Sequence, residues 1–249
     1  MITTVFFDMG GTLEYIRQDT YSRAAGTERI RTTLEDNGIL LSCTNKQLME
    51  ELIQERAAYL EWRKGTNVEL PPEELWSQFM LRFQNVDLER ILTIAETLAN
   101  IWENTMFCRM LRPETRQTLE GLRARGYRIG IISNNTSRTQ VFECLDSYQI
   151  RSYMETVCVS ACIGYAKPHP MIFQYALQQM HVDAASCVYV GDDLVADVLG
   201  AKQAGFAKTV WMSKDADDKS RTATLIQPNL EIVSLSELLP WLDAQSERE

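Results

Sequence analysis

The chain has 249 residues, and its 25 Lys and Arg against 34 Asp and Glu give a formal net charge of −9. Such a chain lacks the positive field that contacts a phosphate backbone, which argues against nucleic-acid binding. Hydrophobic residues make up 45% of the sequence, so an ordinary globular protein with an ample core is expected and disorder is excluded.

The apolar runs are short, so we expect no membrane-spanning segment. The first residues, Met-Ile-Thr-Thr-Val-Phe-Phe-Asp, do not have the pattern of a secretory signal. Six Cys are scattered along the chain without a Cys-x-x-Cys pair, which favours free thiols in a reducing cytoplasm. With only His169 and His181 present, a multi-histidine zinc site or a serine-type triad is disfavoured.

Short β-rich runs recur along the chain, several of them almost continuously apolar, as in parallel strands covered on both faces. Helical patterns with Pro near the start and Gly near the end lie among the later runs. This alternation predicts an α/β fold with a Rossmann-like, doubly wound parallel sheet. The predicted strands are residues 3–8, 127–133, 156–160, 187–191, 208–212 and 231–234, and the predicted helices are residues 113–126, 170–180 and 194–205.

More than a hundred residues separate the first two predicted strands, far beyond the usual connection in such a sheet. Apolar residues recur there at helical spacing, as in Leu48, Leu52, Leu98 and Trp102. We therefore predict a helical module at residues 15–110, inserted into a core domain of residues 1–14 and 111–249. A polar loop is expected at residues 63–72, a surface loop at 213–221 and a frayed tail at 246–249.

Ligands of open α/β sheets bind at the carboxyl ends of the strands. Four of the predicted ends carry polar or glycine residues that could form one site. They are Asp8 with Gly10 and Gly11, Ser133 with Asn134, Lys167, and Asp192 with Asp193 and Asp197.

Several carboxylates in one cleft repel one another unless a cation lies among them. Oxygen ligands favour Mg²⁺, and a bound metal makes such a site hospitable to a phosphate. Lys167, the Ser133 hydroxyl and the backbone N–H groups after it would supply further phosphate contacts. Asp8 is then the natural nucleophile, because a carboxylate can form an aspartyl phosphate that water later hydrolyses.

As an ordered set, these motifs resemble the haloacid dehalogenase (HAD) superfamily, and the likeness covers nearly the whole chain. The resemblance implies that the helical insertion is the family's first-type cap, which closes over the active site and selects the substrate. The motifs that carry the resemblance are Asp8 with Gly11-Thr12-Leu13, Ser133-Asn134, Lys167-Pro168, and Gly191-Asp192 with Asp197.

The same resemblance implies a role for individual residues. Asp8 would be the nucleophile, Ser133 would bind the phosphoryl group, and Lys167 would orient both. The Mg²⁺ ligands would be Asp8, the Gly10 carbonyl and Asp192, with Asp193 or Asp197 supporting through water. We expect a small phosphorylated, anionic metabolite as substrate, a monomer or homodimer, and no nucleic-acid or membrane partner. The expected substrate contacts are Ser133, Asn134, Lys167 and Lys64.

Position 10 departs from the family pattern. Family phosphatases usually carry a second Asp there, which protonates the leaving group and then activates water. Glycine cannot do this, and a positioned acid–base group contributes about 10²–10⁴-fold to the rate. One explanation is a phosphatase whose leaving group needs little protonation, or whose acid comes from the cap or from water.

Glycine at position 10 is also compatible with two different functions. The first is different chemistry on the same scaffold, as in phosphonoacetaldehyde hydrolases, where Lys46 or Lys64 would form a Schiff base, or in haloacid dehalogenases, which work without metal. The second is a ligand-binding protein with decayed catalysis. Asp193 and His169 also have simpler roles available at the starts of helices.

Overall fold

The computed structural model describes residues 1–84, 86–213 and 225–246. Its main sheet has six parallel strands in the order β5-β4-β1-β6-β7-β8. All six lie within two residues of the predicted bounds. They are β1 (Thr4–Phe7), β4 (Arg128–Ser133), β5 (Thr156–Val159), β6 (Cys187–Gly191), β7 (Lys208–Met212) and β8 (Leu230–Ile232).

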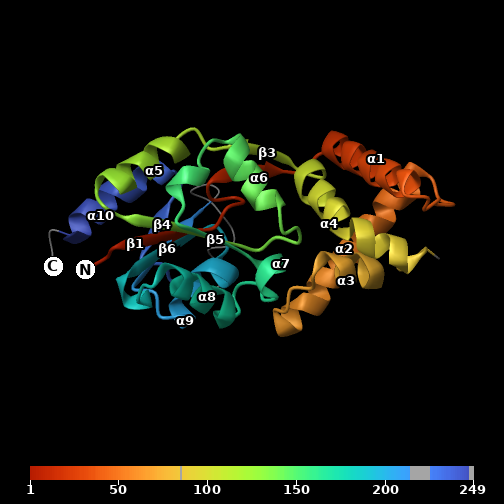
Figure 1. Cartoon of the computed structure of the whole chain (residues 1–249). Coiled ribbons are helices and arrows are strands. Elements are labelled where there is room, and N and C mark those ends of the chain that lie inside the picture. The colour runs from red at the N-terminus through yellow and green to blue at the C-terminus, as the bar shows by residue number, and fades with distance from the viewer. Residues whose placement is uncertain (85, 214–224, 247–249) are drawn as a thin grey trace.

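Helices cover both faces of this sheet (Figure 1). Alternation along β1 sends Val5 and Phe7 into the core on one face and Phe6 into the core on the other. The doubly wound α/β fold is therefore confirmed. The first face is covered by α5 (Thr115–Ala124), α6 (Gln140–Ser147) and α10 (Leu238–Ser246), and the second by α8 (Pro170–Met180) and α9 (Gly200–Gln203).

One predicted helix, residues 194–205, is divided in the structure. Leu194–Leu199 forms a π-helical segment, and α9 follows directly from it. A short helix, α7 (Ser160–Ile163), also follows β5. The stretches 213–221 and 246–249, expected to be a surface loop and a tail, lie outside the described residues except at Ser213 and Ser246.

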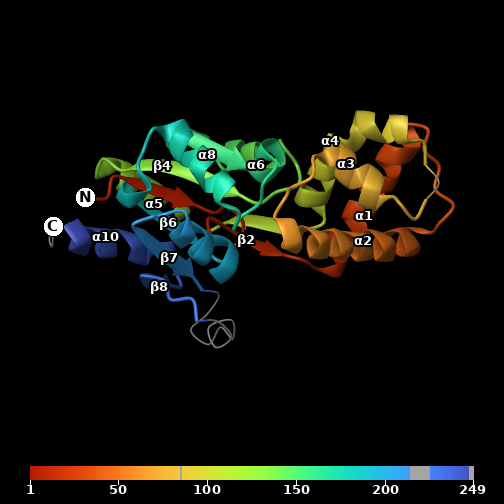
Figure 2. The same ribbon diagram turned by 90° about the horizontal axis from the view of Figure 1, so that it is seen from below.

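Two further strands, β2 (Glu14–Arg17) and β3 (Cys108–Leu111), form a separate antiparallel pair that the sequence did not predict. Each is four residues long, and the two are far apart in the chain, so no local pattern announces their pairing. Figure 2 shows this pair where the chain passes between the main sheet and the helices at the other end of the molecule.

The helices between β2 and β3, together called the helical insertion, share an apolar core of their own. Leu34, Leu52, Leu98 and the two tryptophans Trp76 and Trp102 are buried in it. The helical insertion consists of α1 (Thr20–Asp36), α2 (Asn45–Thr66), α3 (Pro72–Leu75), a π-helical segment (Trp76–Met80) and α4 (Leu88–Thr105).

The polar break predicted to begin at Arg63 begins later. Helix α2 continues to Thr66 and ends at Asn67, whose backbone is left-handed with a φ of 52°. Arg63 and Lys64 form the last turn of α2, where positive side chains interact favourably with the carboxyl end of the helix. Residues that looked like a loop therefore stabilise a helix end.

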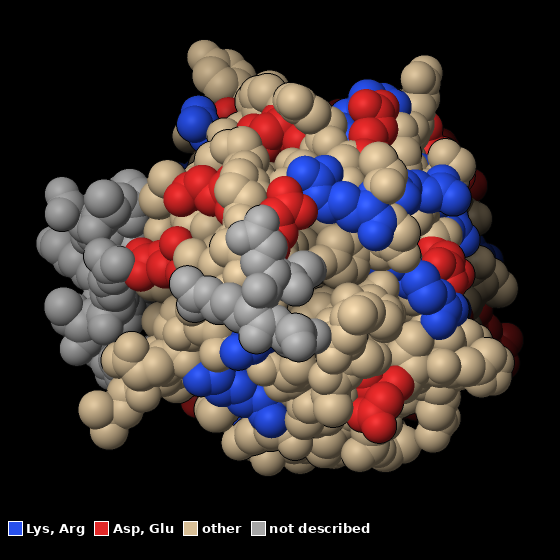
Figure 3. Space-filling view, turned by 90° about the vertical axis from the view of Figure 1, so that its left-hand side faces the viewer, with Lys and Arg blue, Asp and Glu red and all other residues tan. Residues whose placement is uncertain are grey.

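The helical insertion lies beyond the carboxyl ends of the parallel strands (Figures 1 and 2). The opposite end of the core, which carries the chain termini, shows acidic and basic side chains interspersed (Figure 3). Among the described residues, none of the helices has the length and hydropathy needed to cross a membrane.

Candidate active site

Three adjacent strands bring predicted site residues to one edge of the sheet. Asp8 follows β1, Ser133 ends β4 and Asp192 follows β6, and β1 lies between the other two strands. Asp8 and Ser133 are both buried. Parallel strands thus unite residues that are far apart in the sequence.

The ammonium group of Lys167 lies at the centre of this edge. Its Nζ donates hydrogen bonds to Asp8 Oδ1 and Asp197 Oδ1, each at 2.7 Å, and to the Tyr189 hydroxyl at 2.9 Å. All three N–H donors of an ammonium are therefore used. Tyr189, on β6, was not among the predicted site residues, because a tyrosine in a buried strand looks like core.

Burial and charge perturb the two ends of this network. Burial raises the pKa of Asp197 to about 6, with Lys167 acting against the rise and the charge of Asp8 adding to it. Burial acts against the charge of Lys167, yet the negative charges of Asp197 and Asp8 outweigh it and raise the pKa of the ammonium. Lys167 therefore stays protonated beside the two carboxylates.

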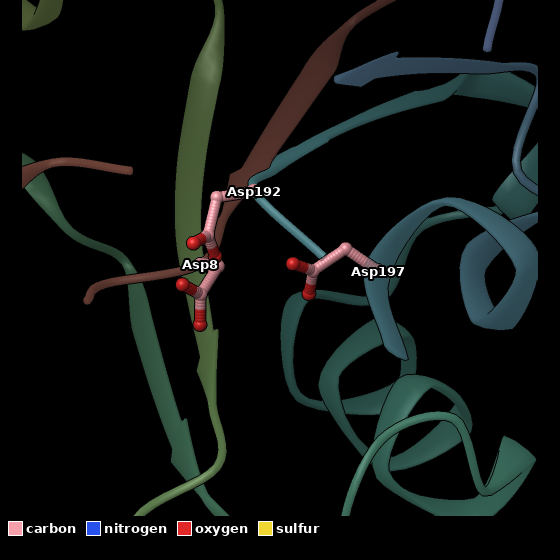
Figure 4. Close-up of side chains that lie close together, drawn as sticks. All are labelled: Asp8, Asp192 and Asp197. Carbon is pink, nitrogen blue, oxygen red and sulfur yellow. The ribbon is translucent and has the colours of Figure 1, made fainter. Parts of the chain in front are cut away.

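Asp8, Asp192 and Asp197 form a cluster of three carboxylates (Figure 4), with one oxygen of each lying within 4.8 Å of the others. Glycines make this approach possible. A Cβ on Gly11, whose φ is +88°, would overlap Asp192, and a Cβ on Gly191 would overlap Asp197. Among the described residues, these three carboxylates offer closely spaced oxygen donors, so the cluster could hold a metal ion and has the donor chemistry that suits Mg²⁺.

Two other predicted residues orient their neighbours. The Asp193 carboxylate accepts from the backbone N–H groups of Val195 at 2.7 Å and Ala196 at 2.8 Å, while its own N–H donates to Asp197 Oδ2 at 2.9 Å. Asp193 thus caps the π-helical segment and stays outside the three-carboxylate cluster.

Asn134 makes two hydrogen bonds to the backbone of Lys167, accepting from its N–H at 2.7 Å and donating to its carbonyl at 3.0 Å. These bonds connect the end of β4 to the loop that carries Lys167. Asn134 therefore has a structural role, and its contact with the substrate stays a prediction.

A cleft of about 490 Å³ lies between the carboxyl end of α2 and the core loops, and Lys64, Asn134 and Lys167 are among its lining residues. The Lys64 side chain is 74% exposed and pairs with Glu61 at 2.8 Å, and that of Lys46 is 81% exposed. Lysines that form Schiff bases are normally desolvated. Neither lysine has that environment.

A smaller pocket of about 150 Å³ contains Asp8, Gly10 and Ser133. Glu103 from α4 and Arg109 from β3 also line it, and sequence reasoning missed both. The one available signal was a carboxylate within the apolar stripe of α4. The helical insertion and β3 therefore each contribute a charged group to the pocket of the predicted nucleophile.

Carboxylates of the helical insertion also bind the loop that follows Ser133, residues 134–139. Glu73 forms a bidentate ion pair with Arg138, with N–O distances of 2.8 and 2.6 Å. Glu96 accepts from the Ser137 hydroxyl at 2.7 Å and from the Arg138 backbone N–H at 3.0 Å. These contacts hold the insertion against the loop next to Ser133.

A second attachment lies beside Lys167. The Ala166 N–H donates to the Asn67 carbonyl at 2.8 Å, and the Glu69 N–H donates to the Gly164 carbonyl at 3.0 Å. The buried Glu69 carboxylate also accepts from the Ser160 hydroxyl at 2.8 Å. The insertion thus contacts the loops that carry both Ser133 and Lys167.

A family model described as haloacid dehalogenase-like hydrolase matches residues 2–205. The chain belongs to the haloacid dehalogenase-like hydrolase family. The family expected from the sequence motifs is therefore confirmed, and its hydrolase fold agrees with the observed sheet order and with a site at the strand ends.

Individual proteins similar to this chain include phosphatases and a dehalogenase. A glyceraldehyde 3-phosphate phosphatase of Pyrococcus abyssi is 35% identical over 58% of this chain, and the match spans only 60% of that protein. A protein of the same name from Methanothermobacter thermautotrophicus is 30% identical over 83% of this chain and 84% of its own. The solved structure of a 2-haloacid dehalogenase from Pseudomonas syringae is 25% identical, covers 98% of this chain and 99% of that one, and has a TM-score of 0.65.

Proposed function

We propose that this HAD-like hydrolase is a Mg²⁺-dependent phosphatase that cleaves a small phosphorylated metabolite through an aspartyl phosphate on Asp8. The observation that carries the proposal is the position of Asp8, 2.7 Å from Lys167 and within a cluster of three carboxylates. The relatives named as phosphatases support a phosphate ester as the substrate.

The hydrogen bonds of Asp8 distinguish its two oxygens. Among the described residues, Oδ1 accepts from Lys167 at 2.7 Å, whereas the one hydrogen bond to Oδ2 is a 3.5 Å contact from the Thr12 hydroxyl. In the proposed first step Oδ2 attacks phosphorus and the bond from phosphorus to the leaving oxygen breaks. Lys167 keeps the carboxylate in place, and Ser133 with the backbone N–H of Asn134 binds the phosphoryl oxygens. The next two N–H groups, of Asn135 and Thr136, already donate to Ser160 and Glu103. Water then hydrolyses the aspartyl phosphate.

The metal would be held by Asp8, Asp192 and the Gly10 carbonyl, with Asp197 or Asp193 supporting through water. When bound, Mg²⁺ would offset the negative charge of the phosphoryl oxygens. Lys167 donates to both Asp8 and Asp197, so its positive charge would reduce the repulsion between these carboxylates and an anionic substrate.

The substrate's remaining atoms would lie in the 490 Å³ cleft, next to Asn134 and Lys64. In this proposal residues 15–110 act as the cap domain over a core of residues 1–14 and 111–249. The Glu73–Arg138 ion pair supports this arrangement, since it connects the helical insertion to the loop that follows β4.

Carbon–halogen hydrolysis is the second candidate function. It is favoured by Gly10, which cannot supply the proton that a phosphatase usually provides, and by the structural likeness to a 2-haloacid dehalogenase. The cluster of three carboxylates that includes Asp8 favours the phosphatase instead, because its oxygen donors suit Mg²⁺.

Hydrolysis of an aryl phosphate and of a 2-haloacid, each with and without Mg²⁺, separates the candidates. The proposal expects Mg²⁺-dependent release of phosphate by the natural chain and none by Asp8→Asn, an isosteric change. Halide release without metal would establish the dehalogenase instead. Tight Mg²⁺-dependent binding of a phosphate ester without turnover would identify a binding protein.

A further inference from the structure

The space beside Gly10 is already filled. The β2–β3 register pairs Ile16 with Arg109, and this places both side chains next to Gly10. A Cβ on Gly10 would overlap Ile16 Cδ1 and would lie 3.8 Å from Arg109 Nη1. Ile16 therefore occupies the space that a side chain at position 10 would need. Glycine itself has no proton-transfer group, so such a group must come from another element.

Glu103 is the carboxylate that the helical insertion contributes to this pocket. Among the described residues that line the pocket with Gly10 and Ser133, only Asp8 and Glu103 carry a carboxyl group. The Glu103 side chain is 8% exposed, so it is held inside the protein with little access to bulk water.

Hydrogen bonds fix the direction of the Glu103 carboxylate. Oε1 accepts from the Thr136 hydroxyl at 2.6 Å, and Oε2 accepts from Arg109 Nη2 at 3.4 Å. Arg56 lies 3.6 Å from Oε1, and Arg109 is itself anchored by Glu14 and by the Glu103 carbonyl. Both oxygens of the Glu103 carboxylate thus act as acceptors in the contacts with the described residues. A carboxylate held in this way at the wall of the pocket can accept a proton from a water molecule there.

We infer that Glu103 accepts the proton of the water molecule that hydrolyses the aspartyl phosphate, an inference that rests on the proposed function. The water oxygen bonds to phosphorus, the bond from phosphorus to Asp8 breaks, and its electron pair returns to the Asp8 carboxylate. The water proton moves to Glu103 and then to solvent. In the first step the leaving oxygen takes its proton from solvent, so both half-reactions balance.

The test is the fate of the intermediate in Glu103→Gln, which keeps the shape of the side chain and removes its charge. With an aryl phosphate, the first turnover should release the phenol in a burst close to the wild-type rate. Steady-state turnover should then fall about 10²–10⁴-fold, the usual contribution of a positioned acid–base group. Acid quenching followed by mass spectrometry should detect phosphorylated Asp8, which Asp8→Asn cannot form.

Glu96→Gln is the matched control, because Glu96 is also a carboxylate of α4 that binds the 134–139 loop but does not line the pocket of Asp8. It should accumulate no phosphorylated enzyme. If Glu103→Gln folds poorly, Glu103→Asp retains the charge and draws the carboxylate back by one methylene. Slower steady-state turnover with partial accumulation of phosphorylated enzyme is expected for that variant.

Three results would overturn the inference. One is wild-type steady-state turnover by Glu103→Gln. Another is an equal loss of burst and steady-state rates, which would make Glu103 a positioning residue for Thr136. The third is equal accumulation of intermediate in Glu96→Gln. Absence of phosphate hydrolysis and of Asp8 labelling in the natural chain would reject the proposed function itself, which is a different and recognisable outcome.

Discussion

Lys167 Nζ lies 2.7 Å from Asp8 Oδ1 in a buried ion pair that connects the loop after α7 to the end of β1. A second bond of the same length, to Asp197, makes the ammonium a bridge between two carboxylates that would otherwise repel each other. Both the reactivity of Asp8 and the stability of the strand ends should therefore depend on this bridge.

Replacing Lys167 with Met should impair both activity and stability. Loss of a positioned charge next to the reacting group should lower kcat about 10²–10³-fold. Removing one partner of a buried ion pair should cost about 3–5 kcal/mol in the free energy of unfolding, measured by urea denaturation. Lys46→Met, at an 81% exposed side chain, is the control. Similar losses in both variants would contradict the assignment.

The Mg²⁺ requirement should distinguish two adjacent aspartates. Asp192→Asn removes a carboxylate from the three-residue cluster, so the Mg²⁺ concentration for half-maximal activity should rise by at least about tenfold. Asp193→Asn should stay close to wild type, because asparagine caps a helix about as well as aspartate. Removing divalent cations with a chelator should abolish turnover in all three proteins. Equal shifts in the two variants would place Asp193 among the metal ligands.

The Glu73–Arg138 ion pair should stabilise the protein near neutral pH and fail in acid. The hydrogen bonds from Arg138 lower the pKa of Glu73 below its ordinary value of 4.5. Stabilisation by a carboxylate with a lowered pKa is present above 4.5 and is lost as the pH falls through the lower, folded value. Thermal unfolding of Glu73→Gln should therefore differ from wild type near neutral pH and converge with it in acid.

The Glu73–Arg138 effect should be small, about 0.2–1 kcal/mol, because both side chains are partly exposed. High salt should reduce it further near neutral pH. A constant difference between Glu73→Gln and wild type across the acid range would show that the variant acts through packing and not through charge.

An aspartate introduced at position 10 should require the Ile16 side chain to move. Gly10→Asp alone should be destabilised only slightly, by about 1 kcal/mol, because its Cβ overlaps Ile16 Cδ1, the end of a flexible and half-buried side chain that can move. Gly10→Asp with Ile16→Ala should recover part of that stability in thermal unfolding, whereas Ile16→Ala alone should not be stabilised. Additive effects in the double mutant would show that Ile16 does not fill the space beside Gly10.

Local pattern predicted the parallel sheet well because its strands are short apolar runs bounded by polar residues. Asp8, Ser133 and Asp192 were predicted to lie together for a related reason, since each follows or ends such a run, whereas Lys167 lies farther along, beyond α7. The pairing of β2 with β3 was missed, because Ile16 and Arg109 become neighbours only after the whole helical insertion has folded. The end of α2 was misplaced because Arg63 and Lys64 suit a helix terminus as well as a loop.

Sequence reasoning missed Glu103, the pocket residue of the helical insertion, for a different reason. Glu103 interrupts an apolar stripe on α4, a signal that indicates burial without naming a partner. Its partners, Thr136 and Arg109, come from the core and from β3. Only the packing of the insertion against the core reveals that they surround the same pocket as Asp8.

Glu14 on β2 is the register partner of Leu111 on β3, so the chain leaves the core and returns to it at neighbouring points. Directly opposed residues of antiparallel strands lie about 4.5–5.5 Å apart. For the core domain, the segment between these two residues acts as one loop whose ends are already joined. Each doubling of the length of such a loop costs only about 0.6 kcal/mol. The helices of the helical insertion can thus change in length and composition at this junction, while the strand ends that carry Asp8 and Asp192 keep their geometry.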